Sequence, residues 1–304
     1  MKIAILSFRS QSSGTQRLTE AALEAGHTVQ VLDPFGCYLH IGGKGKRIYY
    51  NGIPVEDFDV VLPRLGKVTA QYGLEVVAHF EWMGVPVVNR AVSIANARHK
   101  FRSLRILVQH GLPVPPSFTA GSADFLDCAV HQTGDYPFIM KPFEGSQGKA
   151  ILLLDTPTAL ASAINVLCND LYHDYVIQPY MGGSELKAAV VSDIRVLVVG
   201  AKVIAGMRRI AQAGEFRTNL HQGGHGERID LPDLYNNIAI RATDALGLDV
   251  AGVDVLETDD GPVILEVNPS PGMEVETVTG IPIAEAIIAF AAEYAQNHKA
   301  QSEM

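Results

Sequence analysis

The sequence has few cysteines and no long apolar run. Its three cysteines, Cys37, Cys128 and Cys168, are too few and too scattered for a disulfide framework or a zinc cluster, so we expect a protein of the reducing cytoplasm. No stretch reaches the roughly 18 apolar residues that a membrane span needs. The apolar start at residues 1–7 is also too short for a signal peptide. We therefore expect neither secretion nor membrane insertion.

Positive charge is in the minority, with 24 Lys and Arg against 33 Asp and Glu and a formal net charge of −9. Proteins that bind nucleic acid release counterions through an excess of basic residues, so we expect no direct nucleic-acid partner. No G-x-G-x-x-G pattern follows the first expected strand, which leaves a dinucleotide-binding domain without support.

The 304 residues, 47% of them hydrophobic, have the composition and length of a globular protein with two or three lobes, and the order of its expected strands and helices predicts an α/β (α+β) fold. The pattern predicts a strand at 2–7, a helix at 15–25 ended by Gly26, and a strand at 28–32. A hairpin is expected at Asn51-Gly52, followed by a strand at 59–62, a helix at 72–83 and a strand at 85–88. A basic helix at 98–109, closed by Gly111 and the proline-rich segment 112–116, indicates a domain junction.

The second part of the chain alternates between strands and helices and then becomes rich in strands. Strands are expected at 117–119, 137–140, 150–154 and 175–178, and helices at 123–132 and 158–168. Two hairpins follow, 190–199 with 202–207 around Gly200, and 250–257 with 262–267 around 259–261. Helices at 231–246 and 283–298 are expected to cover them.

A glycine-containing loop follows Lys141 at the end of an apolar strand. The loop reads Glu144-Gly145-Ser146-Gln147-Gly148-Lys149, and its glycines would let backbone N–H groups approach phosphate oxygens closely. A strand follows the loop, so this is not a P-loop, which opens a helix. One interpretation is a hairpin lid over phosphates, and an ordinary solvated turn between two lysines is the other.

Asp254, Glu266 and Asn268 form a sharper group of polar residues. A hairpin that turns at 259–261 sets Asp254 nearly opposite Glu266, and Asn268 shares the strand face of Glu266. Carboxylate and amide oxygens are ligands that Mg²⁺ takes together with water and substrate phosphates. Without a metal, the two facing carboxylates would repel, and one would be driven to the protonated form. A solvated hairpin face is the alternative.

A third group is basic and lies on the strands and loop between these motifs. It comprises Arg195, Arg208, Arg209, Arg217 and Asn219. Arginine donates two parallel hydrogen bonds to phosphate or carboxylate oxygens, although each of these arginines alone fits a surface position equally well. His221 and His225 lie in glycine-rich sequence without helix character, so they support a zinc site only weakly.

The order of these motifs resembles the ATP-grasp ligases, and among them the RimK family. The lysine, strand and glycine loop are followed by Gln178-Pro179-Tyr180, Asp193-Ile194-Arg195, the segment 215–224 and the ending 266–272. The N-terminal part adds Pro63-Arg64-Leu65-Gly66, residues 80–84 and residues 93–103. The chain departs from the family pattern at Pro179, at Lys149-Ala150 and in its longer segment 181–192.

The resemblance implies an ATP-grasp fold with three lobes and a nucleotide cleft between the two C-terminal lobes. The implied lobes are 1–97, a pre-ATP-grasp domain, 98–182 with the glycine-rich lid, and 183–304 with the metal site. The nucleotide-binding residues that the resemblance implies are Lys100, Lys141, Gly145, Ser146, Gln147, Gly148, Gln178, Pro179, Tyr180, Asp193, Arg217, Thr218 and Asn219. Asp254, Glu266 and Asn268 would ligate two Mg²⁺ or Mn²⁺ ions, and Arg208 or Arg209 would steady the transferring phosphoryl group.

The activity that the resemblance implies is ATP-dependent amide formation through an acyl phosphate. The best-known member of the family adds L-glutamate to the C-terminus of a ribosomal protein, and we expect the same class of reaction on a protein or peptide. The same chemistry on a small molecule, or poly-glutamate synthesis, is a second hypothesis. A nucleotide-sensing module without turnover is a third, against which the intact Asp254, Glu266 and Asn268 set argues. We also expect a homo-oligomer.

Overall fold

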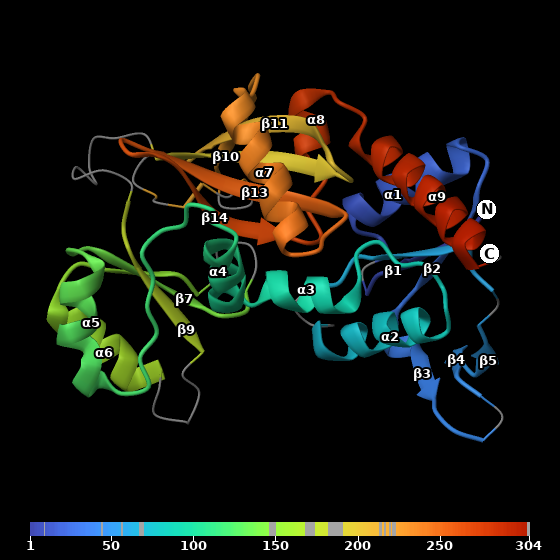
Figure 1. Cartoon of the computed structure of the whole chain (residues 1–304), viewed down its shortest axis with the longest axis horizontal. Coiled ribbons are helices and arrows are strands. Elements are labelled where there is room, and N and C mark those ends of the chain that lie inside the picture. The colour runs from blue at the N-terminus through green and yellow to red at the C-terminus, as the bar shows by residue number, and fades with distance from the viewer. Residues whose placement is uncertain are drawn as a thin grey trace.

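The computed structural model describes residues 1–302 except 9, 44, 56, 67–69, 146–149, 168–173, 182–190, 213, 214, 216, 219, 221 and 222. The described residues form four β-sheets with helices packed on them (Figure 1). A lobe with α5 and α6 occupies one end of the molecule, and the N-terminal unit occupies the other, where both termini lie (Figure 1). None of the described helices is long and apolar enough to cross a membrane.

The N-terminal unit is built on a parallel sheet with strand order β2-β1-β6. Its elements are β1 (Lys2–Leu6), α1 (Ser13–Glu24), β2 (Thr28–Leu32), β6 (Val60–Pro63) and α2 (Ala70–Trp82). The predicted strand-helix-strand start is confirmed, and Gly26 (φ 78°) follows the helix in a left-handed conformation that favours glycine. The strand expected at 85–88 pairs with the sheet only as a single parallel bridge from Val87 to Val61.

A small antiparallel sheet, β3-β4-β5, follows the 3₁₀ turn η1 (Pro34–Gly36). Its strands are β3 (Cys37–His40), β4 (Arg47–Tyr50) and β5 (Ile53–Pro54). Asn51 (φ 50°) and Gly52 (φ 83°) both have positive φ, as a two-residue hairpin turn of the primed type requires. The Asn51-Gly52 hairpin is therefore confirmed.

The expected junction helix is split in two, as α3 (Ala91–Arg98) and α4 (Lys100–Gln109). His99 lies between them in extended conformation, and its Nδ1 accepts a hydrogen bond from the Arg102 N–H at 3.2 Å. The prediction of one helix from 98 to 109 was wrong at its start. The break points the Lys100 N–H at the carbonyl of Phe143 (2.8 Å), which joins α4 to the lysine-bearing strand.

The small lobe contains a three-stranded antiparallel sheet with order β8-β7-β9. Its elements are η2 (Ala123–Phe125), α5 (Leu126–Thr133), β7 (Phe138–Pro142), β8 (Leu152–Leu154), α6 (Pro157–Leu167) and β9 (Tyr175–Pro179). Phe138, Met140 and Leu160 form the centre of its core. The strand expected at 117–119 is a single bridge from Phe118 to Ile177.

The largest sheet is antiparallel, with order β12-β11-β10-β13-β14. Its elements and the helices beside it are β10 (Ser192–Val199), β11 (Lys202–Ile210), β12 (His225–Arg228), α7 (Asp233–Ala245), β13 (Val250–Thr258), β14 (Gly261–Asn268), α8 (Glu274–Thr279) and α9 (Ile283–Ser302). Both predicted hairpins are confirmed by the pairing of β10 with β11 and of β13 with β14. The short helix α8 was not predicted.

Side chains alternate along β10, so the two faces of this sheet pack against different helices. Val196 and Val198 pack toward α7, whereas Leu197 and Val199 face α9. Asp193 and Arg195 lie on this same α9 face, nearer the start of β10 than the apolar residues. The α9 face of the sheet therefore carries two regions. One is apolar and packs against α9, and we call it the hydrophobic seam; the other is polar, begins with Asp193 and Arg195, and we call it the polar floor.

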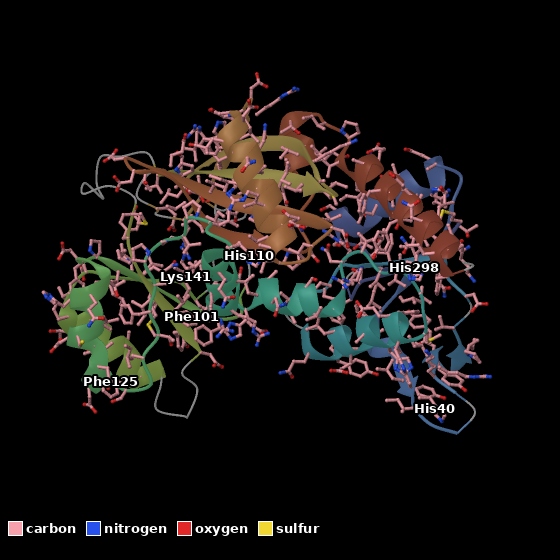
Figure 2. The ribbon with its side chains drawn as sticks, viewed as in Figure 1. His40, Phe101, His110, Phe125, Lys141 and His298 are labelled. Carbon is pink, nitrogen blue, oxygen red and sulfur yellow. The ribbon has the colours of Figure 1, made fainter. Side chains whose placement is uncertain are left out.

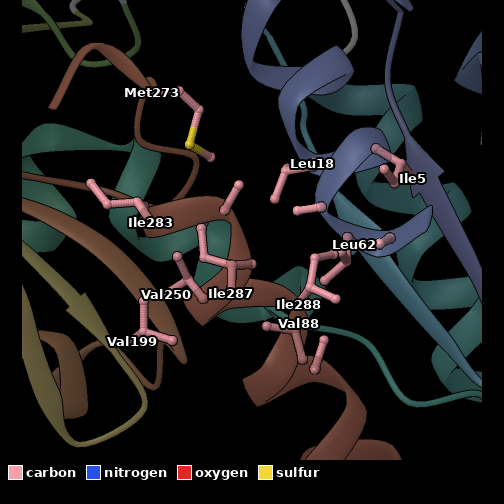
Figure 3. Packing of buried hydrophobic residues seen from close by; sticks show 14 of the residues in the cluster. Ile5, Leu18, Leu62, Val88, Val199, Val250, Met273, Ile283, Ile287 and Ile288 are labelled. Carbon is pink, nitrogen blue, oxygen red and sulfur yellow. The ribbon is translucent and has the colours of Figure 1, made fainter. Parts of the chain in front are cut away.

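The hydrophobic seam joins the beginning and the end of the chain. Ile5, Leu18 and Leu62 of the N-terminal unit share one buried cluster with Ile287 and Ile288 of α9 and with Val199 and Val250 of the large sheet (Figure 3). Buried apolar surface of this kind contributes about 25 cal/mol per Å², so the seam fixes the N-terminal unit against the large sheet. The polar floor beyond the seam is thereby held in one place relative to α1.

Candidate active site

A cavity of about 820 Å³ lies where the three units meet. The start of α1 and the end of β6 line it from the N-terminal unit, and Lys141 and Gln178 line it from the small lobe. Figure 2 labels Lys141 on the side of the small lobe that is nearest to the large sheet. The polar floor of the large sheet closes the cavity with Asp193, Arg195, Asp254 and Glu266. Among the residues that the sequence predicts, the structure thus brings the basic and acidic groups to one space.

The predicted juxtaposition of Asp254 and Glu266 is confirmed, and a β-bulge produces it. Thr258 pairs with Gly261 around a two-residue turn, and at this register Asp254 would face Leu265. The pairing shifts between Asp254 and Val255, so that Asp254 lies opposite Glu266 and Gly252 lies opposite Asn268. The bulge therefore places all three oxygen-bearing side chains on the cavity face.

Asp254 is buried and is held by two arginines. Arg195 donates from Nε and Nη2 to its two carboxylate oxygens at 2.8 and 2.7 Å, and Arg209 Nη2 lies 3.0 Å from Oδ2. Burial by itself would raise the pKa of Asp254, but the attraction of Arg195 and Arg209 outweighs it, and the pKa lies below its ordinary value. The sequence led us to expect that one of the two facing carboxylates is protonated without a metal, and for Asp254 the arginines favour the ionised form instead.

Arg209 also binds Asp193, its register partner on β10. Its Nε and Nη2 donate to the Asp193 carboxylate at 2.7 and 2.5 Å, and the Thr218 hydroxyl donates to Oδ2 at 2.8 Å. Burial, and then the nearby charge of Asp254, raise the pKa of Asp193 against the attraction of Arg209. The pKa of Arg209 lies above its ordinary value, because the attraction of both carboxylates outweighs the effect of burial. Arg209 is thus the charge that holds two buried carboxylates together.

Arg208 lies on the opposite face of the sheet from Arg209. It pairs with Ile194 in the ladder, and its Nη1 lies 2.5 Å from Glu257 Oε2 and 3.3 Å from Ser192 Oγ. It does not line the cavity, whereas Arg209 does. Neighbouring residues of a strand point to opposite faces, and this choice between the two predicted arginines follows from that alternation.

The cations of the predicted phosphate site lie on β7 and at the start of α4. The ammonium of Lys141 donates to Gln178 Oε1 at 2.9 Å, and burial lowers the pKa of Lys141 to about 8. Lys100 Nζ lies 3.6 Å from Glu266 Oε2 and 3.4 Å from the carbonyl of Gly145. Lys100 therefore lies between the glycine loop and the acidic side chains.

Of the other residues predicted to bind the nucleotide, some line the cavity and some lie outside the residues that the structure describes. Gly145, Gln178, Pro179, Tyr180, Arg217 and Thr218 line the cavity. The Tyr180 N–H donates to the carbonyl of Pro137 at 2.8 Å, and Arg217 donates to both carboxylate oxygens of Glu215 at 2.9 and 2.6 Å. Ser146, Gln147, Gly148 and Asn219 lie outside the described residues.

The oxygen donors on β13 and β14 suit a hard divalent cation. The Asn268 amide satisfies both of its polar atoms when the nitrogen donates to Glu266 Oε1 (3.0 Å) and the oxygen accepts from Arg195 Nη2 (3.1 Å). The part of the chain that the structure describes contains no group of three or more His, Cys, Asp or Glu side chains able to hold a metal. A cation here would therefore take two carboxylates and an amide from the protein, and water or phosphate oxygens for the rest, as Mg²⁺ commonly does.

Sequence reasoning missed two features of the site. It named Arg195 only as one of several arginines, although Asp193-x-Arg195 at strand spacing places both on one face beside Asp254. It also named Arg64 only within the motif Pro63-Arg64-Leu65-Gly66, without a role, and missed the cavity wall that Arg64 forms with Ser7, Ser13 and Gly14 of the N-terminal unit. For this wall the sequence carried no spacing signal, because the seam that sets its position joins segments far apart in the chain.

Lysines on one lobe that face acidic side chains on a second, larger sheet are the arrangement that the resemblance to the ATP-grasp ligases implies. Solved structures agree with this fold. A RimK domain protein from Sphaerobacter thermophilus is 23% identical, with a TM-score of 0.71 and coverage of 96% of this chain and 99% of that chain. The ATP-grasp ligase PsnB, solved with a precursor peptide and AMPPNP, is 21% identical, with a TM-score of 0.72 and coverage of 97% and 98%.

The chain belongs to the RimK-like ATP-grasp family. The model of the RimK-like ATP-grasp domain matches residues 97–291, and that of the RimK PreATP-grasp domain matches residues 1–94. A probable alpha-L-glutamate ligase of Thioalkalivibrio sulfidiphilus is 40% identical over 303 residues, which is 99% of each chain. Another from Pseudomonas aeruginosa is 40% identical over 304 residues, covering 100% of this chain and 99% of the relative. The family resemblance and the ATP-grasp fold are both confirmed.

Proposed function

We propose that this protein is an ATP-dependent ligase that adds L-glutamate to the C-terminal carboxylate of a protein or peptide, with a ribosomal protein as the first candidate acceptor. The observation that carries the proposal is the single cavity in which Lys100 and Lys141 face Asp254, Glu266 and Asn268. Relatives at 40% identity over the whole chain bear the name probable alpha-L-glutamate ligase, which supports glutamate as the added amino acid. The proposal includes a cytoplasmic homo-oligomer.

The reaction has two steps that one cavity can hold. A carboxylate oxygen of the acceptor attacks the γ-phosphorus of ATP, and ADP leaves, which gives an acyl phosphate. The amine of glutamate then attacks the acyl carbon, the amide bond forms, and inorganic phosphate and the amine proton leave. Carboxylates do not condense with amines in water at useful rates, so the first step supplies the leaving group for the second.

The protein contributes charge and position. Lys141 and Lys100 would hold the phosphates, and the cleft between the lobes 98–182 and 183–304 would orient the nucleotide along β7 and β9. Arg209 would meet the transferring phosphoryl group, because it lines the cavity and Asp193 fixes its guanidinium. Arg217 and Thr218 would border the phosphates from the same side.

Asp254, Glu266 and Asn268 would hold two Mg²⁺ or Mn²⁺ ions. When bound, such ions neutralise charge on the phosphates and polarise the bond to the leaving ADP oxygen. The chain's share is to keep its carboxylates ionised and aimed into the cavity, which the arginines do for Asp254. Glu266, with 30% of its side chain exposed, is the most accessible of the two carboxylates.

The test begins with the whole chain, ATP, Mg²⁺ and each of the 20 amino acids, alone and with synthetic peptide acceptors. Phosphate release is measured first, and the peptides are then examined by mass spectrometry. Phosphate release with glutamate and a peptide, with mass additions of one glutamate residue each, supports the proposal. Phosphate release with glutamate alone indicates self-addition, and ATP binding without release under any condition indicates a nucleotide sensor.

The pKa of Lys141 predicts how the affinity for ATP depends on pH. A lysine with a folded-state pKa of about 8 is protonated below that pH and loses its charge above it, so its attraction for phosphate declines as the pH rises. We expect ATP to bind about tenfold more weakly at pH 9 than at pH 7, measured by calorimetry. The variant Lys141→Arg, which stays charged, is expected to keep its affinity over this range. An equal decline in both proteins would contradict the assignment of Lys141 to the phosphates.

A further inference from the structure

Arg64 lies in the cavity wall on the N-terminal side, directly after β6. Its N–H donates to the carbonyl of Leu6 at 2.8 Å, which fixes its backbone to the end of β1. Its side chain reaches the first turn of α1, because a Cβ atom on Gly14 would lie only 3.0 Å from Arg64 Nη2. Gly14 thus leaves room for the guanidinium against the start of the helix, where Ser13 and Gly14 also line the cavity.

The guanidinium of Arg64 has no hydrogen bond and no ion pair with any residue that the structure describes. Burial lowers the pKa of Arg64 to about 10, and the attraction of Glu274, which lines the same cavity, opposes this shift. The other described arginines of the cavity, Arg195, Arg209 and Arg217, each hold a carboxylate. Arg64 therefore presents its N–H donors at the cavity wall without a described acceptor, an arrangement that suits an anion.

The start of α1 adds to the positive potential beside Arg64. The first turn of α1 contains no acidic residue, and the helix dipole places partial positive charge there. Ser12 caps the helix by accepting from the Thr15 N–H at 3.4 Å. Arg64 and the helix start therefore face the same part of the cavity with the same sign of charge.

We propose that Arg64, supported by the first turn of α1, binds a carboxylate of the incoming amino acid that does not take part in the reaction. This inference rests on the proposed ligase function. The carboxylate that becomes the acyl phosphate belongs beside the phosphates, near Lys141 and Glu266. The amino acid brings its amine to the same place and keeps its α-carboxylate, and glutamate also keeps its side-chain carboxylate. A fork of parallel donors suits a carboxylate, and it would turn the amine toward the acyl carbon.

Equilibrium dialysis with radiolabelled L-glutamate, in the presence of AMPPNP and Mg²⁺, tests this without any acceptor. We expect Arg64→Gln to bind glutamate at least about tenfold more weakly than the wild type, and Arg64→Lys to recover part of the loss. The Kd of AMPPNP is expected to stay within about twofold in both variants. Arg17→Gln is the matched control, because Arg17 lies on α1 but pairs with Glu276 and Glu285 away from the cavity.

Two analogues show which carboxylate Arg64 binds. Glutamine lacks the side-chain carboxylate, and glutamic acid α-amide lacks the α-carboxylate. The analogue that lacks the carboxylate bound by Arg64 is expected to bind the wild type weakly. Its Kd for Arg64→Gln is expected to equal its Kd for the wild type, because the interaction is already lost. Either result supports the proposal and names the carboxylate.

Thermal unfolding separates this role from a structural one. Because Arg64 has no hydrogen bond or ion pair with a described residue and burial outweighs the attraction of Glu274, Arg64→Gln is expected to unfold at the same temperature as the wild type or higher. Unchanged glutamate binding in Arg64→Gln overturns the inference, as does a rise in the KM of the acceptor peptide with no change for glutamate. A lowered unfolding temperature with equal losses of glutamate and AMPPNP binding also overturns it.

The failure of the proposed function looks different. A wild-type protein that binds no glutamate contradicts glutamate ligation, and the same assay is then run with the other 19 amino acids, each of which carries an α-carboxylate. Binding of one of them that Arg64→Gln loses supports the inference and corrects the substrate. Binding of none overturns both.

Discussion

Glu266→Gln is expected to lower kcat by about a thousandfold while leaving the fold intact. The substitution removes one of the two carboxylates on the polar floor, and the loss of metal-held charge stabilisation in phosphoryl transfer is worth several kcal/mol. Glu266 is partly exposed to the cavity, and its described ion pair is the long one to Lys100 at 3.6 Å, so folding does not depend on it. Steady-state phosphate release and thermal unfolding measure the two expectations.

The control for this experiment lies on the same hairpin but on the other face. Glu257 pairs with Arg208 and accepts from the Tyr235 hydroxyl at 3.0 Å, outside the cavity. Glu257→Gln is expected to keep kcat within about twofold, because Glu257 lies outside the cavity. Its exposed ion pair contributes at most about 1 kcal/mol to the free energy of unfolding. If Glu266→Gln retains near-normal turnover with Mg²⁺, the assignment of the metal site to this hairpin is wrong.

Arg209→Met is expected to destabilise the protein by about 3–5 kcal/mol and to abolish measurable turnover. Arg209 is 3% exposed and neutralises Asp193 and Asp254, which are 5% and 6% exposed. Arg195 still holds Asp254 in the variant, but Asp193 keeps only the Thr218 hydroxyl among its described partners. A buried carboxylate without its cation is the source of the expected loss, which urea unfolding measures.

The pH dependence of this loss follows from the pKa of Asp193. Burial already raises that pKa in the folded protein, and removal of Arg209 raises it further. A carboxyl group with a raised folded-state pKa favours the folded state at low pH and loses that contribution as the pH rises. The destabilisation in Arg209→Met is therefore expected to be smaller at acidic than at neutral pH. Adding Asp193→Asn is expected to recover part of the stability at neutral pH, but not the turnover.

Arg208→Met is the matched comparison for Arg209→Met, one residue away on the same strand. Arg208 has 31% of its side chain exposed and pairs with the exposed Glu257. We expect a loss of at most about 1 kcal/mol in stability and little change in kcat. Equal effects of the two substitutions would show that the face of the sheet does not decide the role of these arginines.

Much of the secondary structure could be predicted from short stretches of the sequence. The Asn51-Gly52 turn, the glycine that ends the first helix and the two hairpins around Gly200 and residues 259–261 were all predicted, because each depends on residues close together in the sequence. The local pattern was less reliable at 98–109, where His99 breaks the helix so that Lys100 can join the small lobe. Contacts over long distances in sequence decide such breaks.

The candidate site divides in the same way. Spacing around a turn sufficed to bring Asp254, Glu266 and Asn268 to one face, although the bulge that completes the pairing is not visible in the spacing. The sequence predicted only that, without a metal, one of the two facing carboxylates would be protonated, and the ionised state of Asp254 depends on Arg195 of β10 and Arg209 of β11. The individual roles of the nucleotide and metal residues remain predictions for the experiments above.

The sequence by itself determined the order of the elements, the family and the residue types that the chemistry needs, because these depend on local patterns and on motifs in series. Only the tertiary structure decided which arginine faces the cavity, which carboxylates are neutralised, and that Arg64 lies at the cavity wall without a hydrogen bond or ion pair to a described residue. The physical reason is that charge interactions depend on distance in space. Those distances are set here by a hydrophobic seam between the first and the last elements of the chain.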